Sequence, residues 1–98
     1  MSRRISFHRL AKQELKEAAH YYDSESHGLG LEFLQEIEQC IQSVVEYPEA
    51  APVLGGPVRQ RLARRFPYAV LYSITPARIR VLAVMHLKRR PMYWVGRQ

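Results

Sequence analysis

The chain has 98 residues, of which 47% are hydrophobic and 24% are charged. These values are typical of a folded protein and exclude a disordered chain. The length is that of one domain, which we assign to residues 1–98. No apolar run approaches the roughly 20 residues that cross a bilayer. The single cysteine, Cys40, can form neither an intrachain disulfide nor a cysteine zinc site. We therefore expect a cytoplasmic protein. The formal net charge of +6 is unevenly divided: residues 1–49 hold all nine acidic and five basic residues, whereas residues 50–98 hold ten basic residues and none acidic.

The first predicted elements are a short strand and two helices. Apolar Ile5 and Phe7 alternate with polar residues, which is the pattern of a strand with one buried face. The apolar period then changes to three and four residues, which predicts one helix to about residue 23 and a second over residues 29–47. Pro48 ends the second helix. Helices joined by so short a turn are expected to pack as an antiparallel hairpin.

The second half of the chain is predicted to form strands. Segment 48–57 is rich in proline and glycine and indicates a loop. Three segments are predicted to be strands. Apolar and polar residues alternate in residues 58–63, and residues 68–74 and 79–85 are rich in valine, isoleucine or tyrosine. The short connection 75–78 predicts that the last two strands form a hairpin. The order β-α-α-β-β-β is that of an α+β fold in which a small antiparallel sheet carries a helical hairpin on one side.

Four stretches of the sequence resemble the RelE/ParE family of bacterial toxins. They are Leu10-Ala11-x-x-Glu14-Leu15-x-x-Ala18-x-x-Tyr21-Tyr22 in the first helix; Phe33, Ile37, Ile41 and Pro48 in and after the second; Arg65-Phe66-Pro67-Tyr68-x-x-x-Tyr72 at the central strand; and residues 79–86 followed by Arg89-Arg90-Pro91-x-Tyr93-Trp94. The resemblance covers essentially the whole chain. It implies the RelE/ParE-like fold and the toxin of a type II toxin–antitoxin pair, which uses no cofactor and is held inactive by a small antitoxin.

The resemblance implies one of two activities. RelE-like members cleave messenger RNA on the ribosome, whereas ParE-like members bind and inhibit DNA gyrase without cutting nucleic acid. Ribonuclease members carry an arginine directly after the tyrosine of the middle strand, but here Ala69 follows Tyr68. Gln60 and Leu62 stand where ribonuclease members use lysines. These differences favour a ParE-like gyrase inhibitor, which is a binder and not an enzyme.

Two alternatives remain: a metal-independent endoribonuclease, and an inactive member that only binds antitoxin. Metal-free RNA cleavage needs a base, an acid and cations around the phosphate. The candidates for these roles are Arg61, Arg80, His86 and Tyr93. Arg80 and His86 have the same parity on the last strand, which predicts that they share a face. The other interpretation of His86 is that it hydrogen-bonds the tail and shapes the strand end.

Basic residues and one tryptophan are the candidate contacts with the antitoxin or the target. A basic segment without carboxylates attracts acidic partners through its uncompensated positive charge. The antitoxin segment is expected to be acidic and to fold on binding. The arginines of residues 58–65 could instead form a solvated edge strand, and Trp94 could anchor the tail to the sheet. No metal site is expected, because the histidines and Cys40 lack ligand spacing. The predicted contacts are Arg59, Arg61, Arg64, Arg65, Arg80, Arg89, Arg90 and Trp94.

Overall fold

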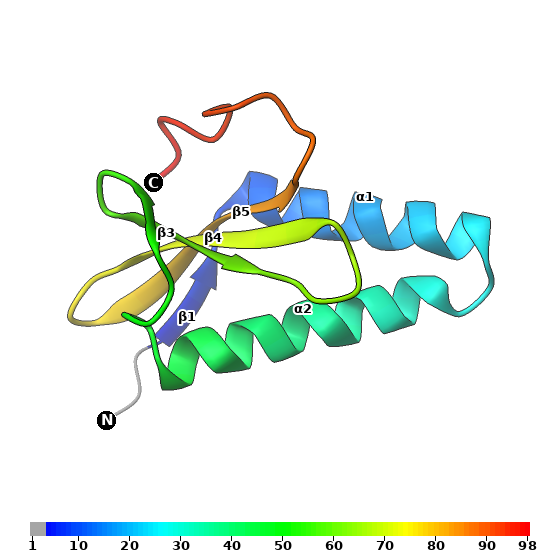
Figure 1. The fold of residues 1–98 in the computed structure, drawn as a ribbon, viewed down its shortest axis with the longest axis horizontal. Coiled ribbons are helices and arrows are strands. Elements are labelled where there is room, and N and C mark those ends of the chain that lie inside the picture. The colour runs from blue at the N-terminus through cyan, green and yellow to red at the C-terminus, as the bar shows by residue number, and fades with distance from the viewer. Residues whose placement is uncertain (1–3) are drawn as a thin grey trace.

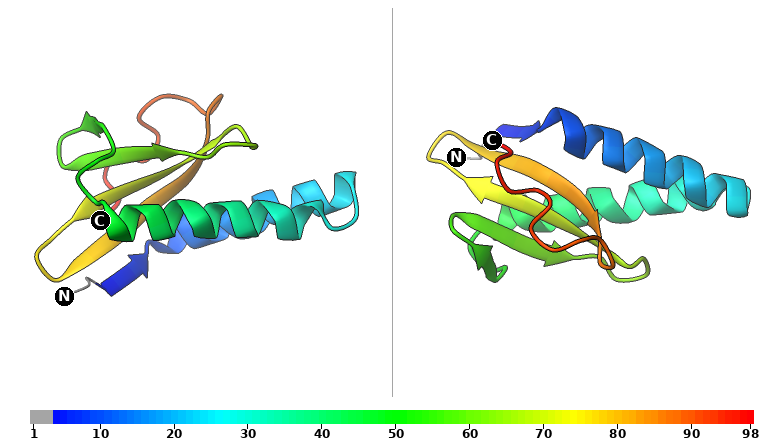
Figure 2. Two further views of the ribbon diagram at one scale, coloured as in Figure 1. Left: turned by 60° about the horizontal axis from the view of Figure 1, so that its bottom comes forward. Right: turned by 90° about the horizontal axis from the view of Figure 1, so that it is seen from above.

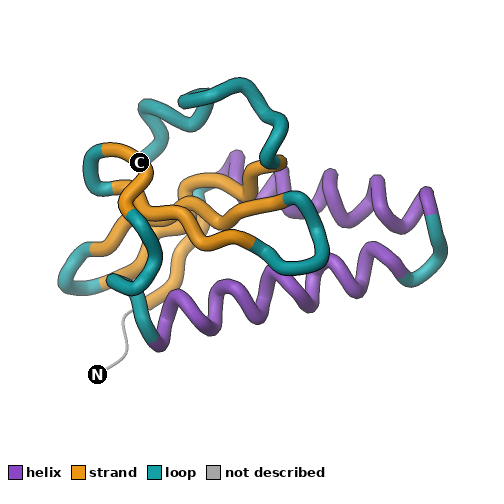
Figure 3. Tube along the Cα trace, in the orientation of Figure 1, coloured by secondary structure: helices purple, strands orange, loops and turns teal. Residues whose placement is uncertain are grey.

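The structure, a computed structural model, describes residues 4–98, so residues 1–3 of the predicted domain lie outside it (Figure 1). The elements are β1 (Arg4–Phe7), α1 (Arg9–Glu25), α2 (Leu29–Glu46), β2 (Val53–Gly55), β3 (Val58–Leu62), β4 (Tyr68–Ile74) and β5 (Arg78–His86). Their order confirms the predicted α+β fold of a helical hairpin and a sheet, with one additional short strand, β2, inside the predicted loop (Figure 3).

The five strands form one sheet in the order β1-β5-β4-β3-β2. The pairs from β5 to β2 are antiparallel, but β1 runs parallel to β5, with Ile5 opposite Ile79. The sheet is therefore mixed, and the prediction of an antiparallel sheet holds for four of its five strands. β1 and β5 come from opposite ends of the chain, and the apolar pattern of a strand says nothing about the direction of its neighbour.

The two helices cover one face of the sheet as an antiparallel hairpin, as Figure 2 shows. The turn between them contains Gly28 with φ 88°, and Asp23 Oδ1 accepts the N–H groups of Gly28 and Gly30 at 3.0 and 3.3 Å. At Gly30 the helices approach so closely that a Cβ atom would collide with the carbonyl oxygen of Ala19. Glycine is thus required there by packing, since its absent side chain lets the two backbones meet.

The main core lies between the helices and the sheet. Four aromatic rings form its end near the hairpin tip: Phe33 packs edge-on against Phe66 and Tyr68 with centroids 5.2 and 4.9 Å apart, and Tyr22 contacts all three. Cys40 is 8% exposed and belongs to this core, as its position in the second helix predicted. The buried members of the core are Ala11, Ala18, Phe33, Ile37, Cys40, Phe66, Val70, Val81 and Val84.

The opposite face of the sheet is covered by the C-terminal tail, residues 87–98, which crosses the strands in the right-hand view of Figure 2. Trp94 is 6% exposed and packs in a second apolar cluster with Val58, Leu71 and Leu82. Both faces of the central strands are thus buried, which accounts for the nearly continuous apolar runs of β4 and β5. Among residues 4–98, no helix is long and apolar enough to cross a membrane.

Candidate functional site

Two of the candidate ribonuclease residues, Arg80 and His86, lie on opposite faces of the sheet. On β5, Arg80 is opposite Ser73 and His86 is opposite Tyr68, and between these pairs a bulge leaves Leu82 without a partner on β4. A bulge adds one residue to one strand, so the side chains beyond it change face. Arg80 therefore lies on the face under the tail, whereas His86 lies on the helix face. The prediction that they share a face is wrong.

His86 makes contacts that shape the end of β5. Its Nδ1 accepts a hydrogen bond from the Lys88 N–H at 3.0 Å, and its ring packs edge-on against Tyr68 with centroids 5.0 Å apart. It borders a hollow of about 180 Å³ that also contains Glu17 and Arg89. These contacts fit the structural interpretation of His86, because one ring nitrogen is already engaged within the chain.

The hydroxyl of Tyr93 is buried and makes no hydrogen bond of standard geometry to the described residues. It lies beside Glu14, whose oxygens are occupied by Arg97 and by the Val84 N–H. Burial, and after it the Glu14 carboxylate, raises the pKa of Tyr93 far above its usual value. The guanidinium carbons of Arg89 and Arg97 lie 4.2 and 4.9 Å from the centre of its ring. Such a hydroxyl is poorly suited to give its proton to a leaving group.

Arg61, the fourth candidate, lies on β3, which is separated from β5 by β4. It borders a hollow of about 210 Å³ between β3 and α2, together with Glu36, Cys40 and Arg64. Arg61, Arg80 and His86 thus line three different hollows. The structure does not bring the candidate cations, base and acid around one phosphate-sized space.

Three of the predicted contact arginines, Arg59, Arg65 and Arg80, form hydrogen bonds or an ion pair within the chain. Arg59 Nη1 donates to the carbonyl oxygens of Glu49 and Ala51 at 3.0 and 2.7 Å and so fixes the loop before β2. Arg65 pairs with Glu32 of α2 at 2.9 Å. The basic half is therefore partly neutralised by the acidic half, through contacts that the sequence did not predict. The predicted contact arginines that remain exposed are Arg64, Arg65, Arg89 and Arg90.

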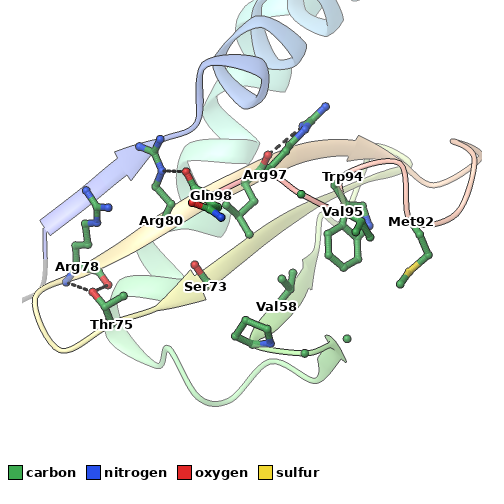
Figure 4. Close-up of a pocket in the computed structure, with 15 residues that line it drawn as sticks. Val58, Ser73, Thr75, Arg78, Arg80, Met92, Trp94, Val95, Arg97 and Gln98 are labelled. Carbon is green, nitrogen blue, oxygen red and sulfur yellow. Dashed lines mark hydrogen bonds between the residues drawn. The ribbon is translucent and has the colours of Figure 1, made fainter.

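An open groove of about 540 Å³ lies between the tail and the hairpin formed by β2 and β3 (Figure 4). Val58 and Trp94 line its apolar part, Arg78 and Arg80 lie at its other end, and Leu82 also belongs to its lining. Trp94 therefore anchors the tail and also lines the groove. Sequence patterns singled out Arg80 and Trp94 but missed Arg78, Met92 and Val95. The available signal for Arg78 was a base in a segment without carboxylates, and for Met92 and Val95 it was apolar residues in a tail with basic neighbours.

An ion pair between α1 and the tail holds the tail in place. Arg97 Nη1 and Nη2 donate to Glu14 Oε1 and Oε2 at 2.9 and 3.0 Å, and Arg97 also donates to the Leu82 carbonyl. Arg80 Nε donates to the main-chain oxygen of Gln98 at 3.2 Å. The tail is thus tied to the sheet edge by charge and to the sheet face by Trp94. Within the described residues, no group of three His, Cys, Asp or Glu side chains is placed to hold a metal ion.

The fold and these surfaces define a small α+β protein of the RelE/ParE type, with a basic surface and an open apolar groove. The chain belongs to the ParE toxin family, since the family model described as "ParE toxin of type II toxin-antitoxin system, parDE" matches residues 5–91. No curated protein sequence matches it. Its structure is similar to a chain of the "Chromosomal ParDE TA system from P. aeruginosa", with a TM-score of 0.65 over 86% of this chain and 95% of that chain. At 14% identity this likeness concerns the fold alone.

Proposed function

We propose that this chain arrests growth by binding and inhibiting DNA gyrase, and that a small antitoxin encoded beside it neutralises it in the cytoplasm. Membership of the ParE family supports a toxin of a type II toxin–antitoxin system. In this proposal the toxin contributes no covalent chemistry, no cofactor and no metal ion. Its effect on gyrase comes from binding.

The observation that carries this proposal is the separation of the ribonuclease candidates. Arg80 and His86 lie on opposite faces, and the Tyr93 hydroxyl is buried. Ala69, at the position where ribonuclease members carry an arginine, is 0% exposed and packs under the tail with Leu71 and Trp94. An arginine at position 69 would have to displace this apolar cluster, so the sheet face is built for packing and not for a phosphate.

The surfaces available for gyrase are the exposed cations and the tail. Arg64 and Arg90 are exposed, and the exposed side chain of Arg89 stacks on Tyr93. Exposed cations of one sign raise association rates with an acidic partner surface and make them sensitive to salt. We therefore propose that Arg64, Arg89 and Arg90 contact the target.

A supercoiling assay with purified gyrase tests this function. The chain alone is expected to reduce supercoiling of relaxed plasmid in proportion to its concentration, and addition of the antitoxin is expected to restore it. The control is the same assay with topoisomerase I, whose relaxation activity should not change. If gyrase activity is unaffected while ribosome-bound messenger RNA is cleaved, the chain is a ribonuclease and the proposal fails.

A further inference from the structure

Two loops at one end of the sheet carry a dense cluster of exposed cations. Residues 63–67 connect β3 to β4, and residues 87–91 follow β5. The two loops lie side by side in the right-hand view of Figure 2, and the Leu87 N–H donates to the Pro67 carbonyl at 2.9 Å. Neither loop contains a carboxylate. Their exposed basic residues, which we call the loop cations, are Arg64, Arg65, Lys88, Arg89 and Arg90.

Acidic neighbours neutralise only part of this charge. Arg65 pairs with Glu32 of α2 at 2.9 Å, and the other four loop cations form no ion pair within residues 4–98. Glu36 lies at the margin of the cluster, where its carboxylate accepts the Arg65 N–H at 2.8 Å. Glu17 borders the hollow beside Arg89. Since five cations meet three carboxylates, the cluster keeps a net positive charge.

Contacts within the chain hold the second loop in place before a ligand binds. His86 Nδ1 accepts the Lys88 N–H at 3.0 Å, and the Arg89 guanidinium carbon lies over the Tyr93 ring, 4.2 Å from its centre. A ring covers one face of a guanidinium group and leaves the N–H groups at its edge free to donate to phosphate oxygens. Less side-chain freedom is then lost when a phosphate binds.

The makeup of the two loops favours the backbone of a nucleic acid duplex as the ligand. Leu87 is the one large apolar side chain that they expose, whereas the centre of a protein interface is rich in apolar side chains and poor in charge. Phe66 is 7% exposed, and Arg89 covers the ring of Tyr93, so these loops offer no open ring on which an unpaired base could stack. Duplex DNA requires neither feature, because it presents one phosphate per roughly 1.7 Å of helix axis.

Other surfaces of the chain suit a duplex less well. Helix α2 carries four acidic residues and no basic residue. At the beginning of β5, Arg80 donates to the main-chain oxygens of Phe7 and Gln98 at 3.0 and 3.2 Å and lies beside the apolar groove. The end of the sheet that carries the loop cations is therefore the better surface for a polyanion.

We infer that the loop cations bind the phosphate backbone of double-stranded DNA without reading its sequence. The inference deepens the proposed function and rests on it for its setting: gyrase acts on duplex DNA, so the target that Arg64, Arg89 and Arg90 meet includes the DNA that the enzyme holds. Cations that neutralise phosphates release the counterions of DNA, which makes the affinity fall steeply as salt rises.

Fluorescence anisotropy of a labelled duplex of about 20 base pairs, titrated with the full chain, tests this binding. We expect the affinity to fall about 100-fold between about 50 and 200 mM salt, which corresponds to about four neutralised phosphates. A duplex of scrambled sequence should bind with the same affinity within about twofold. Three results would each overturn the inference: no binding at the lower salt concentration, an affinity that does not change with salt, or competition by polyglutamate as strong as that by DNA of equal charge.

Two substitutions test where the duplex binds. Arg90→Gln should weaken binding about 3- to 10-fold and make the salt dependence shallower by about one phosphate. The matched control is Arg78→Gln, which removes an exposed arginine at the opposite end of β5 and should change the affinity by less than about twofold. Equal effects of the two substitutions would contradict the assigned site.

The supercoiling assay separates the failure of this inference from the failure of the proposed function. Arg90→Gln should raise the concentration that half-inhibits gyrase about 3- to 10-fold, whereas Arg78→Gln should leave it unchanged. A chain that binds duplex DNA through the loop cations but does not inhibit gyrase supports the inference and refutes the proposed function. A chain that inhibits gyrase and does not bind DNA refutes the inference alone.

Discussion

Glu14 of α1 and Arg97 of the tail, 83 positions apart in the sequence, form a bidentate ion pair with N–O distances of 2.9 and 3.0 Å. Their side chains are only 12% and 10% exposed. Glu14 Oε1 also accepts the Val84 N–H at 3.1 Å, on the part of β5 that extends beyond its last partner in β1, Phe7. One carboxylate thus completes the free edge of the sheet and fixes the end of the tail.

Arg97→Ala is expected to destabilise the fold by about 3–5 kcal/mol, because it leaves the buried Glu14 carboxylate without its cation. The control is Arg65→Ala, which breaks the exposed pair with Glu32 and should cost about 0–1 kcal/mol. Urea unfolding measures both values. Trp94 is the single tryptophan, so a red shift of its emission in Arg97→Ala reports release of the tail. Equal costs for the two variants would show that the ion pair does not hold the tail.

Tyr93→Phe is expected to leave the stability at neutral pH unchanged or slightly increased, since the buried hydroxyl that it removes has no hydrogen bond of standard geometry among the described residues. The pKa of Tyr93 is raised by burial, so its contribution to stability is present below about pH 10 and is lost as the pH rises further. Thermal unfolding between about pH 9 and pH 11 should therefore show a smaller loss of stability for Tyr93→Phe than for the original chain. A steeper loss in the variant would contradict this assignment.

Gly30→Ala is expected to destabilise the fold by about 1–3 kcal/mol, because the added methyl group collides with the Ala19 carbonyl and forces the helices apart. Its neighbour Leu31 is 59% exposed, and Leu31→Ala should change stability by less than about 0.5 kcal/mol. Chemical denaturation of both variants measures the difference. If Gly30→Ala is as stable as Leu31→Ala, the close approach of the helices does not constrain position 30.

His86→Ala and Tyr93→Phe are both expected to keep their toxicity and their neutralisation by antitoxin. The reason is that His86 shapes a strand end and the hydroxyl of Tyr93 is buried, so neither group is placed to act on a target. Colony counts after induction, with and without antitoxin, measure toxicity, and circular dichroism confirms that each variant is folded. Loss of toxicity in a folded, antitoxin-binding variant would make that residue a catalytic candidate.

The periodicity of the sequence predicted both helices, four of the five strands and the core position of Cys40, because burial of one helix face or of both strand faces leaves a local apolar pattern. Strand β2 was missed, since three residues beside Gly56 carry too short a pattern. The parallel pairing of β1 and the bulge at Leu82 depend on distant partners, so local parity placed Arg80 and His86 on one face incorrectly. The Glu14–Arg97 pair has no sequence signal, because nothing local links residues so far apart.

Pulse-labelling of DNA and protein synthesis, minutes after the chain is induced without antitoxin, tests the proposed target most directly. We expect thymidine incorporation to fall first while methionine incorporation continues, because a gyrase inhibitor stops replication before it affects translation. Co-expression of the antitoxin should restore both. If methionine incorporation falls first, the target is translation and the gyrase proposal is wrong. If neither falls, the chain is an inactive family member.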